Sequence, residues 1–249
     1  MLTRHSTPLH HHALRVLQET KHSSKSWFWM IRDLCLIYSL EHPLITLSSP
    51  PPKITYKNTV RSHVIAYWEN LLRSEAATLI SLRFFNPNFM NLTQPHPIWT
   101  TPGSNQYEIT KAVQQARFLS GRYRTESLAR HWNTNMGGFC TVGDCDNTVE
   151  TVEHILIECP SYSVNRQKLR SLWLSCDIPV VSPLIIEALS SQPSYLLQFI
   201  IDCSVLPNVI RARQNHGDII FNKIFYYTRT WCYTLHKARM RLLNRWNFQ

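Results

Sequence analysis

Three cysteines and one histidine, residue types that bind transition metals, lie within one short stretch of the chain. They are Cys140, Cys145, His154 and Cys159, with the spacing Cys-x4-Cys-x8-His-x4-Cys. Thiolate sulfur and imidazole nitrogen are the ligands that tetrahedral zinc prefers, and one histidine with three cysteines completes a structural zinc set. A complete set leaves no coordination position for a catalytic water. The four residues therefore predict a Zn2+ ion that stabilises a binding module rather than a zinc enzyme.

A short helix is expected to carry the histidine of this set. Asn147 and Glu150 have the types and spacing of a capping pair, so the sequence predicts a helix over residues 150–158 that presents His154. The proline after Cys159 disfavours the α conformation at that cysteine, so we expect the chain to leave the helix there and turn the last thiolate back toward the others. The alternative is that the cysteines are small buried hydrophobic side chains that bind no metal.

The basic charge of the chain points to an anionic partner. A formal net charge of +10 indicates that the protein binds a negatively charged partner, either nucleic acid or an anionic surface. Residues 131–165, around the expected zinc ion, contain no lysine or arginine, so we expect the zinc ion to hold basic flanking helices that make the contact. The candidate nucleic-acid contacts, RNA or DNA, are Arg117, Arg122, Arg124, Arg130, Arg166, Lys168, Arg170, Lys223, Arg229, Lys237 and Arg241.

The chain reads as a mainly α protein: an irregular helical assembly with a small structural zinc knuckle and a long C-terminal amphipathic helix. Glycine is scarce, and apolar residues recur at spacings of three and four. Helices are expected at 60–85, 107–119, 125–132, 164–174, 183–189 and 195–203, whereas the proline-rich passages 42–52 and 86–102 are not expected to hold a regular helix. The expected organisation is a disordered polar tail (1–25), a helical region with proline-rich linkers (26–104), the zinc-knuckle region with basic flanking helices (105–175) and a C-terminal helical region (176–249).

The last helix has the most regular pattern. Its apolar residues step by three or four from Ile220 to Leu242, which is the stripe of one long amphipathic helix. Away from this stripe, one side carries Lys223, Tyr226, Arg229, Tyr233, Lys237 and Arg241. Bases interleaved with tyrosines can clamp phosphates and stack on nucleobases. The alternative is a solvated basic face beside a buried stripe.

The chain carries no recognisable catalytic constellation. Two-metal nucleases need several converging carboxylates, but the acids here are scattered, and Asp33 is the single aspartate before Cys140. There is no phosphate-binding glycine loop and no nucleophile elbow. We therefore expect that the protein is not an enzyme.

Cysteine usage and hydropathy indicate an intracellular protein, nuclear or cytoplasmic and not secreted. The seven cysteines are an odd number, and three of them lie with His154 in one candidate metal set, which argues against a disulfide framework and favours a reducing compartment. The other cysteines, Cys35, Cys176, Cys203 and Cys232, are expected to be buried or inert. No uninterrupted apolar run of about 20 residues exists, so no membrane partner is expected.

The segment that carries the four candidate ligands, residues 137–159, is named here the metal segment, and it resembles a known region together with its flanks. Residues 150–162 read Glu-Thr-Val-Glu-His-Ile-Leu-Ile-Glu-Cys-Pro-Ser-Tyr and run on to Arg166 and Leu169, and residues 119–131 have the look of the approach to the same motif. Together they resemble the zinc-binding region at the C-terminal end of non-LTR retrotransposon reverse transcriptases. The resemblance covers residues 107–175 well and implies that Cys140, Cys145, His154 and Cys159 bind zinc.

That resemblance also implies a function and an origin. In related elements the region is thought to help the enzyme bind its RNA template and target DNA, so the chain would be a C-terminal fragment without its polymerase domain. An RNase H domain lies upstream of the knuckle in some elements, but the carboxylates here do not fit one. The alternative is a structural or protein-interaction module that packs against the missing polymerase domain. Its supporting feature is the aromatic content, which includes Trp27, Trp29, Trp68, Trp99 and Trp132.

Overall fold

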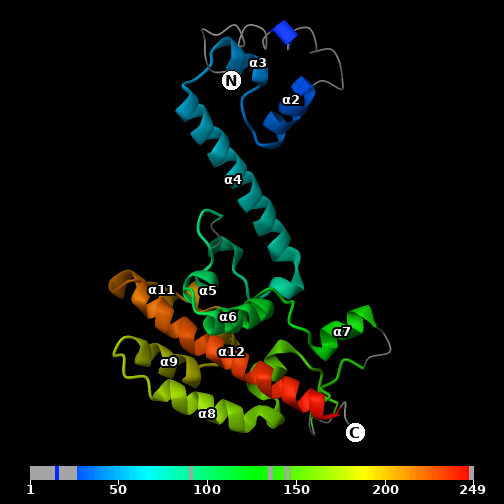
Figure 1. Cartoon of the computed structure of the whole chain (residues 1–249), viewed down its shortest axis with the longest axis vertical. Helices are drawn as coiled ribbons and strands as arrows, with labels where there is room; N and C mark the ends of the chain where they lie inside the picture. The colour runs from blue at the N-terminus through cyan, green and yellow to red at the C-terminus, as the bar shows by residue number, and fades with distance from the viewer. Residues whose placement is uncertain are drawn as a thin grey trace. The chain divides into compact units, whose positions relative to one another are not determined.

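The regular elements of the described chain are helices, which confirms the mainly α fold class (Figure 1). The computed structural model describes residues 15–16, 27–89, 92–133, 137–142, 145 and 147–246. The polar tail expected at 1–25 lies outside this range except for two residues. The chain folds into two compact units: unit 1 is residues 1–75 with 91–93, and unit 2 is residues 76–90 with 94–249. This division is coarser than the four stretches expected from the sequence, which stay a prediction.

Unit 1 contains α2 (Trp27–Ile37), α3 (Pro43–Ser48) and most of α4 (Lys53–Thr78). The helix predicted over residues 60–85 therefore begins and ends seven residues earlier than expected. It starts directly after the run of three prolines, and Leu79 adopts an extended conformation that ends it.

Short helices occupy both proline-rich passages, so the expectation that neither holds a regular helix is wrong. In α3 and in α5 (Pro97–Thr100), proline stands at the start of the helix, where its missing N–H costs nothing. The preceding histidine caps each start through Nδ1. His42 accepts from the Leu44 N–H at 3.3 Å, and His96 accepts from the Ile98 N–H at 3.2 Å.

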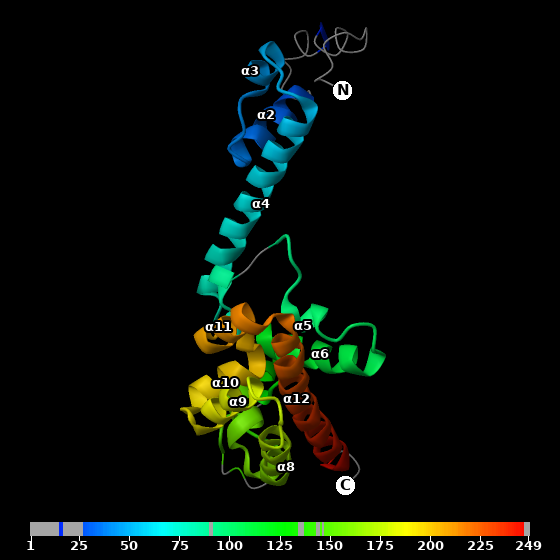
Figure 2. The ribbon, with the colours of Figure 1, turned by 90° about the vertical axis from the view of Figure 1, so that its left-hand side faces the viewer.

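Unit 2 is built around α12, with α5 and α6 on one side of it, α8 and α9 on another, and α10 packed against both α12 and α6 (Figures 1 and 2). Its longer helices are α6 (Gln106–Leu119), α7 (Glu126–Trp132), α8 (Ser163–Leu174), α9 (Val181–Ser190), α10 (Pro193–Asp202), α11 (Pro207–His216) and α12 (Asp218–Trp246). The helices predicted at 107–119, 125–132, 164–174, 183–189, 195–203 and at the C-terminus are confirmed within a few residues, while α11 was not predicted.

The central place of α12 explains its wide buried surface. The predicted stripe is largely buried, including Ile224 and Trp231, but Phe221, Phe225 and Cys232 are buried as well. These three continue a second apolar series at spacings of three and four. A helix packed on two sides buries both series, so the predicted apolar stripe is one part of the buried surface of α12, which is a core helix.

By length and composition alone, one helical stretch of the described chain, Pro193–His216, could cross a membrane. Half of its most apolar window is buried inside the protein, and a core helix passes the same test.

Candidate metal centre

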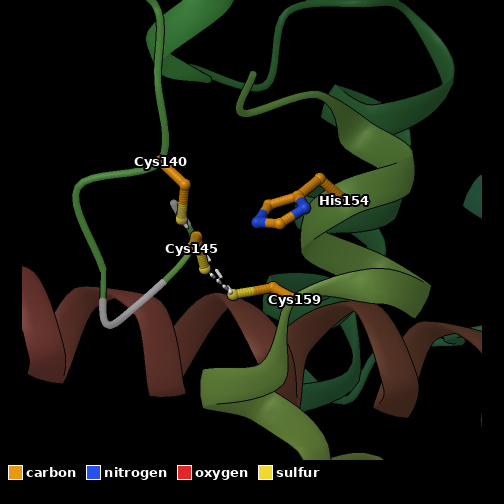
Figure 3. A group of neighbouring side chains, drawn as sticks. All are labelled: Cys140, Cys145, His154 and Cys159. Carbon is orange, nitrogen blue, oxygen red and sulfur yellow. Dashed lines mark hydrogen bonds between the residues drawn. The ribbon is translucent and has the colours of Figure 1, made fainter. Parts of the chain in front are cut away.

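The four predicted ligands converge on one point (Figure 3). The ligand atoms of Cys140, Cys145, His154 and Cys159 all lie within 4.8 Å of one another. The Sγ atom of Cys159 is 4.0 Å from that of Cys140 and 3.6 Å from that of Cys145. Metal–sulfur bonds of about 2.3 Å in a tetrahedron place sulfur atoms about 3.8 Å apart, so the spacing suits a tetrahedral metal ion.

The imidazole of His154 supplies an independent test of this fit. Both ring nitrogens are buried and have no hydrogen-bond partner among the described residues, and the nearest carboxylate oxygen, on Glu158, is 3.8 Å from Nδ1. Figure 3 shows one ring nitrogen turned toward the three sulfur atoms. Buried polar atoms are normally paired, so a metal ion among the four side chains would satisfy a nitrogen that is otherwise orphaned.

Burial favours the neutral forms of these side chains when no ion is bound. It raises the pKa of the Cys140 thiol, and the neighbouring Cys159 adds to that rise. It also lowers the pKa of the His154 imidazole. A bound cation reverses this preference for the thiols, because coordination deprotonates them.

A small hairpin presents the first two cysteines. The Cys140 N–H donates to the Thr148 carbonyl and the Glu150 N–H to the Gly138 carbonyl, around a bridge between Phe139 and Val149. Asn147 lies in the turn with a φ of 59°, in the left-handed region that asparagine tolerates. It therefore does not cap a helix, and the expected capping pair of Asn147 and Glu150 is wrong.

A π-helical turn presents the other two ligands. The helix begins after Thr151, whose Oγ1 accepts from the His154 N–H at 3.1 Å. From His154 to Glu158 it widens, and the Cys159 N–H donates to the His154 carbonyl at 2.6 Å, five residues back. This wider turn brings both ligands to the same side. Cys159 itself has a non-helical ψ of 120°, as expected for a residue before proline.

The carbonyl oxygen of Val142 contacts residues on both sides of the loop that holds the first two cysteines. It lies 3.4 Å from the Sγ atoms of Cys140 and Cys145 and accepts a hydrogen bond from the Ser161 hydroxyl at 3.0 Å. Ser161 lies in the short 3-10 turn Pro160–Tyr162, directly before α8. The segment before the metal set and the segment after it are therefore joined beside the sulfur atoms.

Glu150 connects the metal segment to two helices. Its side chain is fully buried. One oxygen accepts from the Glu126 N–H at the start of α7 at 2.9 Å and from the Arg239 guanidinium of α12 at 2.6 Å. Burial opposes the charge on Arg239, but the hydrogen bond and the charge of Glu150 outweigh it and raise the pKa of Arg239. A single carboxylate thus ties α7, the hairpin and α12 together.

Most of the predicted nucleic-acid contacts lie at the surface. Arg117, Arg122, Arg124 and Arg130 are exposed around the corner between α6 and α7, Lys168 and Arg170 are exposed on α8, and Lys237 and Arg241 are exposed near the end of α12. Lys223 is half-buried. Arg166 is also half-buried and donates to the Glu158 carbonyl at 3.3 Å, so it serves the knuckle itself.

The prediction that Arg229 contacts nucleic acid is wrong, because its buried side chain cannot reach a phosphate. Its side chain is only 5 % exposed. The guanidinium pairs with the Glu108 carboxylate at 2.5 Å and donates to the Thr101 hydroxyl at 3.0 Å. Burial works against the charge of Glu108, but hydrogen bonds from Lys111 and Arg229 lower its pKa on balance. Arg229 therefore holds α12 against α6.

Sequence reasoning missed the roles of Glu150 and Arg239. A signal existed for the arginine, since Arg239 falls four residues after Leu235, on a buried side of α12. A charge at such a position requires a buried partner. Nothing local identified Glu150 as that partner.

No family model, no curated protein and no solved structure matches the chain.

Proposed function

We propose that the protein is a non-catalytic, zinc-stabilised nucleic-acid-binding module. The observation that carries this proposal is a group of four exposed arginines around the corner between α6 and α7: Arg117, Arg122, Arg124 and Arg130, named here the corner arginines. None of them forms an ion pair with a residue that the structure describes. Unpaired, exposed cations gathered in one region suit a phosphate backbone.

The corner arginines are supported by the metal segment. Arg130 lies on α7, whose first turn is bound to Glu150. Gly138 of the hairpin packs closely against the same helix, because a Cβ there would lie 3.2 Å from the Arg130 side chain. A metal ion that closes the hairpin would thus hold α7 and its arginine in place.

Zinc is the ion that the ligand set favours. Three thiolates and one imidazole in a tetrahedral arrangement suit Zn2+ or an iron–sulfur centre, and a lone imidazole with three cysteines is common in structural zinc sites. All four protein ligands are present, so the ion would have a structural role. The resemblance to the C-terminal zinc-binding region of non-LTR retrotransposon reverse transcriptases agrees with this proposal and supplies its suggested origin.

The proposal is tested by replacing all four corner arginines with glutamine. We expect nucleic-acid affinity to fall and the slope of log Kd against log salt to flatten by up to about 3.6, since each of the four lost phosphate contacts removes about 0.7–0.9 from the slope. The measurement is fluorescence anisotropy of labelled RNA and DNA across a salt series. A matched control removes four other exposed cations, Lys53, Lys57, Arg61 and Arg211.

Two results would contradict the proposal. One is an unmodified, zinc-loaded protein that binds neither RNA nor DNA at low salt. The other is an equal loss in the corner variant and in the control, which would indicate that only net charge matters.

A protein-interaction module is the second candidate, favoured by the apolar surface of unit 1. Met30 and Leu36 on α2 are 67 % and 68 % exposed, and Ile54 at the start of α4 is 74 % exposed. Exposed apolar side chains in one unit are typical of a partner surface. If a reverse transcriptase polymerase domain is the partner, Met30→Lys with Leu36→Lys abolishes its binding and leaves nucleic-acid affinity unchanged.

A further inference from the structure

Three tyrosines from two helices form one exposed surface on unit 2, named here the tyrosine surface: Tyr107 of α6 with Tyr226 and Tyr233 of α12. Tyr107 is 54 % and Tyr226 38 % exposed, and Tyr233 is half-buried. The rings of Tyr107 and Tyr233 meet edge to face with centroids 5.6 Å apart. Tyr226 and Tyr233 are seven residues apart, which places them on the same side of the helix about 10 Å from each other. The crossing of α6 and α12 that brings the three together is visible in Figures 1 and 2.

The layer beneath these rings is ionic rather than apolar. Lys111 is 5 % exposed, and its Nζ lies 4.5 Å from the centroid of Tyr107 and 5.1 Å from that of Tyr226. The same Nζ donates to Glu108 at 2.7 Å and to the Thr230 hydroxyl at 3.3 Å. Tyrosines that merely seal a hydrophobic core would lie on apolar side chains. Here they lie on a buried ion network, so core burial does not explain their position.

The charge of the tyrosine surface is positive. Glu108, the acid of the network, is shared between Lys111 and Arg229, which leaves an excess of one positive charge in the layer below. Two further cations flank the rings on α12. Lys223 Nζ lies 6.0 Å from the centroid of Tyr226, and Lys237 Nζ lies 5.6 Å from that of Tyr233.

The tyrosine surface continues toward the corner arginines. The ring of His236 packs against Tyr233 at 6.4 Å, and its Nδ1 is 3.1 Å from the Tyr123 hydroxyl. After the effect of burial, the charge of Arg117 lowers the pKa of His236 further, which reflects its proximity. One ligand could therefore contact the tyrosines and the arginines together.

We infer that the tyrosine surface stacks on the unpaired bases of single-stranded nucleic acid, while Lys223 and Lys237 contact its phosphates. This inference rests on the proposed function and names its substrate class. Stacking requires a free base face, and the bases of a duplex already stack on one another. Aromatic rings with flanking cations are the arrangement that binds single strands without sequence readout. The surface therefore selects single strands over duplexes.

The experiment compares two triple variants of the full, zinc-loaded chain: one with leucine and one with phenylalanine at positions 107, 226 and 233. The probes are a labelled 20-nucleotide RNA of mixed sequence, the DNA of the same sequence, and the duplex of each. Leucine keeps apolar volume but removes the ring, whereas phenylalanine keeps the ring. We expect the leucine variant to bind single strands about 100-fold more weakly, since each lost stack weakens binding at least about five-fold, while the phenylalanine variant stays within about three-fold of the parent.

Each outcome separates this inference from the proposed function. A parent protein that binds duplex as tightly as single strands overturns the inference, and so does a leucine variant with undiminished single-strand affinity. Either result leaves the proposed function standing if the corner-arginine variant still loses binding. Equal losses in the leucine and phenylalanine variants would also overturn it, because the hydroxyls rather than the rings would then matter. Loss of single-strand binding in the leucine variant alone supports it, and the RNA and DNA arms identify which strand is preferred.

Discussion

At the scale of single residues, one buried carboxylate, that of Glu150, links the segment of the four candidate ligands to two helices. Glu150 lies one residue beyond the hairpin bridge and accepts hydrogen bonds from α7 and α12. Arg239 is buried beside it and also lies 3.6 Å from Glu126. A buried ion pair adds little net stability when both partners are present, but the loss of one partner leaves a buried charge uncompensated.

Glu150→Ala is therefore expected to lower the free energy of unfolding by about 3–5 kcal/mol, because Arg239 loses its main partner in the interior. Urea unfolding of the zinc-loaded protein measures the change. Glu153→Ala is the matched control, since Glu153 pairs at 2.6 Å with Arg83, whose side chain is 45 % exposed. That substitution should cost less than about 1 kcal/mol. Equal losses in the two variants would contradict the role assigned to Glu150.

At the scale of elements, the turn after α6 positions the corner arginines. The N–H groups of Arg122 and Tyr123 both donate to the Arg117 carbonyl, which ends the helix and reverses the chain. Gly121 sits in this turn with a φ of +63°, and a Cβ there would clash with the carbonyl oxygen of Ser81. The turn thus needs glycine for its backbone conformation and for its close packing.

Gly121→Ala is expected to destabilise the protein by the cost of a left-handed alanine, about 1–2 kcal/mol, plus about 1–3 kcal/mol for the forced shift of backbone. Gly103→Ala separates the two costs, because Gly103 has a φ of +60° but no atom within 4 Å of an added Cβ. Thermal unfolding of both variants gives the comparison. If Gly103→Ala is as damaging as Gly121→Ala, the contact with Ser81 is not what requires glycine.

Sequence reasoning succeeded at this scale where the signal was local. The periodicity of residues 107–119 and 220–242 predicted α6 and α12, and the spacing of Cys140, Cys145, His154 and Cys159 predicted that these four side chains lie together. The pattern failed where a distant partner decides the structure. Arg229 looked like a surface base, but its partner Glu108 is 121 positions away. The π-helical turn was missed because nothing in residues 150–158 distinguishes it from a regular helix.

At the scale of the whole molecule, α12 is the helix that connects the features of unit 2. It contacts the segment of the four candidate ligands (residues 137–159) through Arg239 and carries two of the three residues of the tyrosine surface. Trp231 of α12 donates its indole N–H to the Leu156 carbonyl at 3.1 Å, and its ring packs against Trp173 of α8. The hairpin, the π-helical turn and α12 therefore form one packed body. Structural zinc binding is folding free energy, so an ion at the four ligands would stabilise this body and the surfaces it carries.

The most direct test of the account is nucleic-acid affinity with and without the metal. Anisotropy of the single-stranded RNA probe across a salt series is measured on the zinc-loaded protein, after chelation, and on Cys145→Ser, with Cys176→Ser as a control for loss of a buried thiol outside the metal set. Metal content is determined in each sample. The account predicts about one zinc per chain in the parent and in Cys176→Ser. It also predicts tight, steeply salt-dependent binding in both, and loss of zinc and binding together after chelation and in Cys145→Ser. Binding that survives verified removal of zinc would contradict it.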